Sequence, residues 1–219
     1  MAWVDPMKND KTIIYYSANT ESQEFEQRIR DDLVKKAGDI HIISVTRKPI
    51  DLGTNICVGE QPVCYTNEWR QLLIGLKAAK TKFCITAEAD CLYPPDYFNF
   101  TPPVEDKMFN YENIWIVWKH HNGFWRKTGF CEGAQMCGRE FWISRIEPLL
   151  GEGWEPMTRN QESNLVLKFF PTRGTWTGDP VISFKTRDGV SYRTTFINEK
   201  IMEIPYWGNI ASLKQKYFA

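Results

Sequence analysis

The chain has 219 residues, enough to bury a sizeable core and within the usual range of one large domain. Apolar residues make up 42% of it and charged residues 25%, a balance typical of globular proteins rather than disordered tails or membrane proteins. Lysine plus arginine and aspartate plus glutamate each number 27, so no overall charge attracts the protein to nucleic acid or an anionic membrane. The overall balance does not exclude a local basic patch on the surface.

No stretch approaches the roughly 18 consecutive apolar residues that a membrane span needs. The first ten residues, MAWVDPMKND, lack the basic start and apolar run of a secretion leader. We therefore expect a cytoplasmic protein whose residues 1–219 form a single domain, because no composition shift marks a boundary.

Six cysteines occur without a C-x-x-C pair, and no secretion signal favours their oxidation, so we expect free thiols. They are Cys57, Cys64, Cys84, Cys91, Cys131 and Cys137. A zinc site built from them with His120 or His121 would need folding to gather ligands that lack the usual close spacing, and we favour the free thiols over it.

The first elements along the chain alternate between strand and helix. The β-branched and aromatic run KTIIYYSAN predicts a strand, and Thr20 and Gln23 after it have the spacing of a helix capping box. The helix that starts there has one apolar stripe and can end at Gly38. The stripe comprises Phe25, Ile29, Leu33, Val34 and Ala37. Residues 40–45, IHIISV, predict the next strand.

Two strands joined by a helix form a βαβ unit with parallel strands. After an irregular segment from Lys48 to Tyr65, the pattern recurs as a helix and the strand KFCITA. The apolar face of this helix comprises Trp69, Leu72, Leu73, Leu76 and Ala79. The fold class is therefore α/β, with a mostly parallel central sheet.

The second half alternates less regularly. We expect strands at 113–121 and in DPVISFKT, a helix at 139–150 that is interrupted near Pro148, and a short helix at 160–170. Residues 118–130, WKHHNGFWRKTGF, mix aromatic and basic groups. They fit a solvated hairpin better than a nucleic-acid surface.

Polar residues follow each of the first three predicted strands. Ser17 and Asn19 follow the first, residues 46–48 with Thr46 the second, and Glu88 and Asp90 the third. In such sheets ligands bind outside the carboxyl ends of the strands. We therefore expect these residues to converge on one crevice.

Glu88 and Asp90 are separated by one residue, so in an extended segment both carboxylates point to the same side. One Mg²⁺ or Mn²⁺ ion could bridge them, because hard cations prefer carboxylate oxygens and complete their shells with phosphate and water. The alternative is an acidic pair in a solvated turn.

The run YTNEWRQLLIGLKAAKTKFCITAEADCLYP, after the βαβ unit, resembles the nucleotide-sugar-dependent glycosyltransferases with the glycosyltransferase-A fold, and most of all the small single-domain members related to family 2. The resemblance covers residues 11–100, the half expected to bind the donor, and residues 101–219 would bind the acceptor. It implies transfer of a sugar from a nucleoside-diphosphate donor to a hydroxyl acceptor, a glycan or a hydroxymethylated DNA base.

In this family the acid-x-acid element binds a divalent metal that bridges the donor phosphates and neutralises the leaving group. The resemblance assigns that role to Glu88 and Asp90, with Asp90 the stronger ligand because glutamate replaces the commoner first aspartate. Ser17 and Asn19 would hold the nucleoside, or cap the following helix instead.

The preceding helix borders the donor crevice in the family. Gln71 there is a nucleotide contact in our hypothesis, and Arg70 or Lys77 would pair with phosphate, unless they form an ordinary solvated face. Many relatives use a late histidine as a metal ligand. This chain has none after residue 121 and offers Lys185, which would bind the diphosphate directly.

An inverting transferase needs a carboxylate base beside the acceptor hydroxyl. Glu132, in the glycine-flanked loop GFCEGAQMCG, is our choice over Glu155 and Glu162. Two alternatives to a glycosyltransferase stay open. One is a nucleotidyltransferase, although YYSANTESQ lacks its glycine-rich phosphate loop, and the other is a non-catalytic nucleotide- or glycan-binding module.

Overall fold

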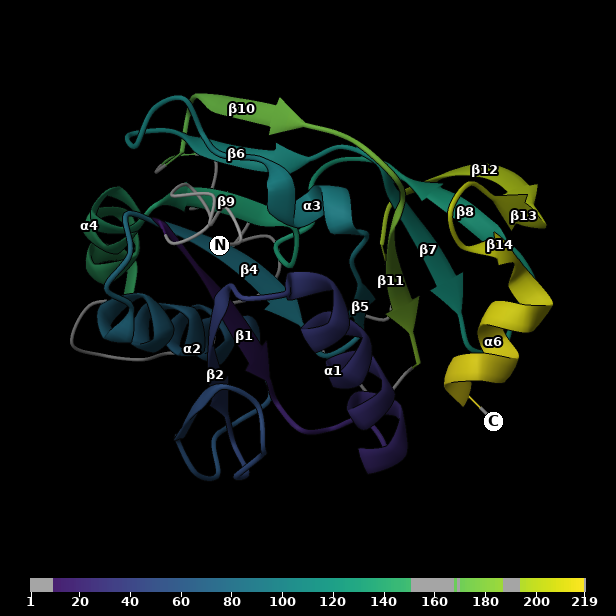
Figure 1. Ribbon diagram of the computed structural model, residues 1–219, viewed down its shortest axis with the longest axis horizontal. Helices are drawn as coiled ribbons and strands as arrows, with labels where there is room; N and C mark the ends of the chain where they lie inside the picture. Colours follow the sequence, from purple (N-terminus) through teal and green to yellow (C-terminus); the bar gives the residue numbers. More distant parts are fainter. Residues whose placement is uncertain (1–9, 151–167, 169, 187–193, 219) are drawn as a thin grey trace, which may run out of the picture.

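The computed structural model describes residues 10–150, 168, 170–186 and 194–218. Its elements form a seven-stranded sheet, a five-stranded sheet and a two-stranded ribbon, with helices packed on the larger sheets (Figure 1). Among the described residues, no helix is long and apolar enough to cross a membrane.

The seven-stranded sheet has the order β10-β6-β9-β4-β1-β2-β3. Its strands are β1 Lys11–Ser17, β2 His41–Thr46, β3 Thr54–Cys57, β4 Phe83–Glu88, β6 Met108–Tyr111, β9 Gln135–Gly138 and β10 Arg173–Trp176. β1 pairs in parallel with both β2 and β4, which confirms the predicted βαβ unit. β9 alone runs antiparallel to its neighbours, β4 and β6. The mostly parallel central sheet is thus confirmed.

Helices cover both faces of this sheet, and successive β1 residues alternate between the two resulting cores. Ile13 and Tyr15 pack on the side of α1, Gln23–Ala37, and α3, Pro95–Asn99, and Ile14 and Tyr16 on the side of α2 and α4. α2 spans Tyr65–Ala78 and α4 spans Arg139–Leu150. Figure 1 shows α2 and α4 together at one side of the sheet. This two-sided covering explains why β1 is buried along its whole length.

The five-stranded sheet has the order β12-β8-β7-β11-β5 and lies to the right of the first sheet in Figure 1. Its strands are β5 Cys91–Leu92, β7 Ile114–Trp118, β8 Phe124–Lys127, β11 Val181–Lys185 and β12 Phe196–Ile201. α1 and the terminal helix α6, Ile210–Phe218, contribute to the core beside it. The ribbon of β13, Glu203–Ile204, and β14, Gly208–Asn209, precedes α6. The predicted hairpin of residues 118–130 is confirmed, because β7 and β8 pair antiparallel.

Several local predictions need correction. Ser22, rather than Thr20, caps α1, because its hydroxyl accepts a hydrogen bond from the Phe25 amide. Val34 is 50% exposed and does not belong to the buried stripe. The segment expected to be irregular contains the edge strand β3.

The later helices show a further difference. α4 continues through Pro148 to Leu150 without the predicted interruption. The helix expected at 160–170 falls largely outside the described residues, as do Glu155 and Glu162. Strands from both predicted halves, 11–100 and 101–219, share the seven-stranded sheet, and their division into donor and acceptor parts stays a prediction.

Candidate functional site at the carboxyl ends of the parallel strands

The carboxyl ends of β1, β2 and β4 lie side by side, as the polar strand ends predict. Ser17 is in register with Thr46 of β2, and Tyr16 with Glu88 of β4. A pocket with a volume of about 170 Å³ opens there. Its lining includes Tyr16, Ser17, Arg47, Gln71, Glu88, Asp90, Lys127, Phe130, Cys131, Glu132 and Lys185. Six of the predicted site residues therefore share one cavity.

Glu88 ends β4 with its carboxylate fixed from several sides. Its Oε1 accepts a hydrogen bond of 3.0 Å from the Tyr16 hydroxyl, and the Cys91 thiol lies 3.7 Å from Oε2. A Cβ atom on residue 133 would come within 2.4 Å of the carboxylate, so only glycine leaves room for it. Burial raises the pKa of Glu88 well above its usual range, and the nearby acid Asp90 adds to this rise.

Asp90 lies in the turn between β4 and β5 and pairs with a lysine from the other sheet. The Lys185 ammonium at the end of β11 is 3.3 Å from Asp90 Oδ2, and both side chains are mostly buried. Burial alone would lower the pKa of Lys185, but Asp90 and the other acids around it outweigh this and raise the pKa. The ammonium therefore stays charged at the pocket wall.

Two thiols lie beside these acids. The Cys91 and Cys131 sulfurs form a side-chain hydrogen bond, which raises the pKa of Cys91 and lowers that of Cys131. All six cysteines are free, as predicted. Cys91 comes from β5 and Cys131 from the loop before β9, so folding alone brings them together.

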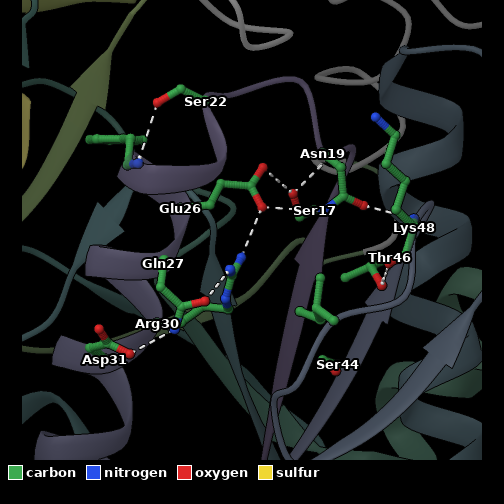
Figure 2. A network of polar contacts seen from close by, with 12 residues as sticks. Ser17, Asn19, Ser22, Glu26, Gln27, Arg30, Asp31, Ser44, Thr46 and Lys48 are labelled. Carbon is green, nitrogen blue, oxygen red and sulfur yellow. Dashed lines mark hydrogen bonds and ion pairs between the residues drawn. The ribbon is translucent and has the colours of Figure 1, made fainter.

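Ser17 and Asn19 bind a buried ion pair (Figure 2). The Ser17 hydroxyl donates to Glu26 Oε1 at 2.9 Å, and the Asn19 amide donates to Oε2 at 3.2 Å. Arg30, one helical turn after Glu26, completes the cluster at 3.1 Å. These side chains neither cap α1 nor extend freely into the pocket, although Ser17 lines it.

Asn19 also joins the ends of the first two strands. It has a positive φ of 50°, which asparagine tolerates better than most residues, and its Oδ1 accepts a hydrogen bond from the Lys48 amide. The Thr46 hydroxyl donates to the Lys48 carbonyl at 2.7 Å and is fully buried. Neither Asn19 nor Thr46 lines the pocket, so both support its rim from behind.

The two predicted residues of α2 differ in position. The buried Gln71 amide donates to the carbonyls of Ser17 and Val45, each at 2.8 Å, and so ties the ends of β1 and β2 together at the pocket wall. Lys77 lies near the other end of the helix, is half exposed, and pairs with Glu147 of α4. The structure therefore does not bring Lys77 to the pocket.

Glu132 lies on the pocket wall in the loop before β9. Its backbone is fixed, because the Thr86 hydroxyl lies 3.1 Å from the Glu132 carbonyl and accepts a hydrogen bond from the Gln135 amide. Among the described residues, none is seen to donate a hydrogen bond to the Glu132 carboxylate.

Sequence reasoning did not predict several other lining residues, among them Tyr16, Arg47, Lys127 and Phe130. Arg47 follows β2 within the polar segment already noted, and its guanidinium binds the Ala18 carbonyl and Glu60. Lys127 and Phe130 belong to the aromatic and basic segment after β7. Side chains along β1 alternate between the two faces of the sheet, and Tyr16 points to the face that α2 covers. This alternation was the signal in the sequence that could have indicated its contact with Glu88.

A second hollow adjoins the pocket and shares Lys127 and Phe130 with it. Its lining also includes Arg126, Thr175 and Arg173. The Arg173 guanidinium lies 3.8 Å from the centre of the Phe130 ring, a cation–π distance. Phe130 thus separates two adjoining cavities.

No protein-family model matches the sequence, and no curated protein matches it. Solved structures match the fold. TarS of S. aureus gives a TM-score of 0.53 at 8% identity, covering 80% of this chain and 36% of that chain. The mannosyltransferase PcManGT of Pyrobaculum calidifontis, solved with GDP-Man and Mn²⁺, gives 0.50 at 12% identity, covering 83% and 58%. The chain has the glycosyltransferase-A fold.

A nucleotidyltransferase shares this likeness. The inositol-1-phosphate CTP transferase of T. maritima gives a TM-score of 0.50 at 12% identity and covers 83% of this chain and 91% of that one. The chain spans less than half of some of the matching structures, 36% of TarS and 45% of the glycosyltransferase GlyE of Streptococcus pneumoniae. At these identities the likeness concerns the fold alone. The predicted fold is therefore confirmed, and any proposal about activity must be argued from the residues of the site.

Proposed function

We propose that the protein transfers a sugar from a nucleoside-diphosphate donor to a hydroxyl acceptor. One observation carries this proposal: the pocket at the carboxyl ends of the parallel strands combines an acidic turn, three cationic side chains and further carboxylates, among them Glu132. The cations are Arg47, Lys127 and Lys185. A diphosphate needs positive charge around it, and an acceptor hydroxyl needs a base.

A divalent cation fits the acidic turn. Glu88 and Asp90 line the same pocket, and burial together with neighbouring acids raises the pKa of Glu88, a cost that a bound cation would relieve. Asp90 and Glu88 would hold the ion, as the Mn²⁺ in PcManGT suggests for this fold. When bound, the ion would neutralise charge on the departing nucleoside diphosphate.

The remaining roles belong to side chains of the chain itself. Lys185 and Lys127 would bind the diphosphate, and Ser17 with Gln71 would line the nucleoside side. Glu132 would accept the proton of the acceptor hydroxyl, which enters from the hollow beyond Phe130. Asn19 and Thr46 would act indirectly, by holding the strand ends that form the nucleoside side.

The test measures donor binding. Each of a panel of nucleoside-diphosphate sugars is added with Mn²⁺ or with a chelator, and the melting temperature is recorded. A donor at 100 times its dissociation constant should stabilise the fold by about 2.7 kcal/mol. No stabilisation by any donor would contradict the proposal.

Asp90→Asn provides the matched variant. It removes a charge and keeps the size, so we expect transfer to slow about 100-fold or more, because a metal contributes several kcal/mol to such a reaction. The fold should melt within a few degrees of wild type. Asp31→Asn, at an exposed acid on α1, is the control and should leave the rate unchanged. Wild-type turnover in Asp90→Asn would remove this residue from the metal site.

A nucleotidyltransferase is the second candidate, because the T. maritima CTP transferase matches over 91% of its length. The products distinguish the two reactions. A glycosyltransferase releases a nucleoside diphosphate, whereas a nucleotidyltransferase releases pyrophosphate from a nucleoside triphosphate. Incubation with triphosphates and sugar phosphates, followed by a pyrophosphate assay, decides between them.

A further inference from the structure

Two cysteines and one glutamate form a compact group beneath the pocket. The Sγ atoms of Cys91 and Cys131 and one carboxylate oxygen of Glu88 all lie within 4.8 Å of one another. Both cysteines are buried, with 1% and 5% of their surface exposed. The group joins the end of β4, the start of β5 and the loop before β9, three segments that pair with or adjoin one another.

The geometry points to a binding site for a thiophilic divalent metal ion of the Zn²⁺ class, held by Cys91, Cys131 and Glu88. This site shares Glu88 with the acidic turn proposed for the donor, but its two sulfur ligands favour Zn²⁺ over Mg²⁺ or Mn²⁺. It does not depend on sugar transfer. Asp90 Oδ1, 3.4 Å from the Cys91 sulfur, is the nearest oxygen for a fourth position.

The spacing agrees with tetrahedral coordination. A sulfur at about 2.3 Å and an oxygen at about 2.1 Å from Zn²⁺ lie about 3.6 Å apart in a tetrahedron. The distance from Cys91 Sγ to Glu88 Oε2 is 3.7 Å. This pair of ligand atoms would therefore move little, and the second thiol, within 4.8 Å of both, would close inward by about 1 Å or less.

Binding would exchange protons for the metal. Each thiol loses its proton to solvent as a sulfur–metal bond forms, and the carboxylate contributes an oxygen lone pair, so no oxidant or reductant takes part. The positive charge of Lys185, which pairs with Asp90, offsets part of the negative charge of the two thiolates. Glu88 keeps its hydrogen bond from Tyr16 through the other oxygen, Oε1.

The chain contains a matched pair of thiols without a carboxylate. Cys84 of β4 and Cys137 of β9 are directly opposed in the sheet register, and both are fully buried. Among the described residues, Glu88, Cys91 and Cys131 form the group spaced for a metal, and this second pair does not belong to it. Comparing variants of the two pairs therefore distinguishes loss of metal binding from the general effect of removing a buried cysteine.

The experiment uses the full chain, reduced with a phosphine and freed of metal by a chelator that is then removed. Cd²⁺ is titrated as the probe, because its thiolate bonds absorb in the ultraviolet, and Zn²⁺ affinity is measured by competition. We expect one ion to bind per chain with the absorption of two thiolates. Failure of Cd²⁺ to produce this absorption in fully reduced wild type would overturn the proposal.

The variants locate the ion. Cys91→Ser and Cys131→Ser should each weaken Cd²⁺ binding by more than about 100-fold, since even residues that merely support a ligand change metal affinity 10- to 100-fold. Glu88→Gln should weaken it while keeping both thiolate bonds. Cys84→Ser and Cys137→Ser should bind Cd²⁺ as wild type does. Equal binding by all four cysteine variants, or loss only at Cys84 and Cys137, would overturn the assignment.

Folding is checked separately. Circular dichroism and the melting temperature of each metal-free variant show whether it is native, and Glu88→Gln supplies a test at a ligand other than cysteine. Donor sugars are absent throughout, so this proposal and the transferase proposal fail independently. Cd²⁺ binding without donor binding would contradict only the transferase, and the reverse result only the thiol site.

Discussion

Two buried polar clusters lie close to the pocket, and their charges are balanced differently. In the cluster of Glu26 and Arg30 the carboxylate meets a guanidinium, a hydroxyl and an amide. In the cluster around Glu88 and Asp90, two carboxylates and two thiols lie beside the ammonium of Lys185. In the first cluster each carboxylate oxygen of Glu26 accepts a hydrogen bond, and the cluster holds a loop in place. The second cluster has more acidic groups than cationic ones, and a bound cation would balance this excess of negative charge.

The largest effect is expected at Glu132, on the acid-rich side. Glu132→Gln keeps the size and removes the base, so single-turnover transfer should slow by roughly 10²- to 10⁴-fold while donor affinity stays the same. Glu140→Gln, at an exposed glutamate of α4, is the control. A normal transfer rate would exclude Glu132 as the base and direct attention to Glu155 and Glu162.

The balanced cluster should respond in stability instead. Arg30→Met removes the partner of a buried carboxylate, so the free energy of unfolding at neutral pH should fall by about 3 kcal/mol. Arg28→Met, on the same helix and with a single long hydrogen bond to the Lys216 carbonyl, should cost far less. Urea denaturation measures both. Equal losses would mean that the ion pair contributes nothing beyond packing.

The same variant carries a pH dependence. Burial raises the pKa of Glu26 above its ordinary 4.5, and Arg30 is among the groups that pull it back down. Without Arg30 the pKa rises further, and a raised carboxyl pKa means that stability is lost as pH increases through it. The difference between Arg30→Met and wild type should therefore be smallest below pH 4.5 and grow toward pH 7. A difference that does not change with pH would contradict this.

The smallest effect is expected at Lys185, the cation that pairs with Asp90 in the acid-rich cluster. Lys185→Ala should weaken donor binding by about tenfold, the value of one charged hydrogen bond. Calorimetry with the donor measures it, and Lys119→Ala, at an exposed lysine beside the same strand end, is the control. Unchanged donor affinity would restrict Lys185 to its pairing with Asp90.

Local patterns in the sequence predicted much of the fold. The apolar stripes of α1 and α2 and the short connections between strands determine β1, β2 and β4, and these strands place Ser17 and Glu88 at one edge. The N-cap of α1 was predicted wrongly because serine and threonine are both good N-caps, and only the path of the backbone selects Ser22 over Thr20. The edge strand β3 was missed because its four residues carry no clear period.

Contacts between distant segments were beyond sequence reasoning. Nothing in GFCEGAQMCG indicates that Cys131 meets Cys91, or that Gly133 leaves room for the carboxylate of Glu88, because both depend on how β9 pairs with β4. The ion pair between Lys185 and Asp90 likewise joins elements of two sheets. The acidic residues Glu88 and Asp90 could be picked out from the sequence. The two thiols beside them could not, because long-range packing brings these together.

The antiparallel strand β9 also affects the order in which the chain can fold. β1 to β4 can assemble from neighbouring βαβ units, but the free edge of β4 stays unpaired until residues 135–138 leave the ribosome and insert between β4 and β6. Pairing across such a distance in sequence is slow, because the intervening chain must lose entropy first. An exposed hydrophobic strand edge invites pairing with other chains. The nascent protein is therefore most prone to aggregate between synthesis of β4 and arrival of β9.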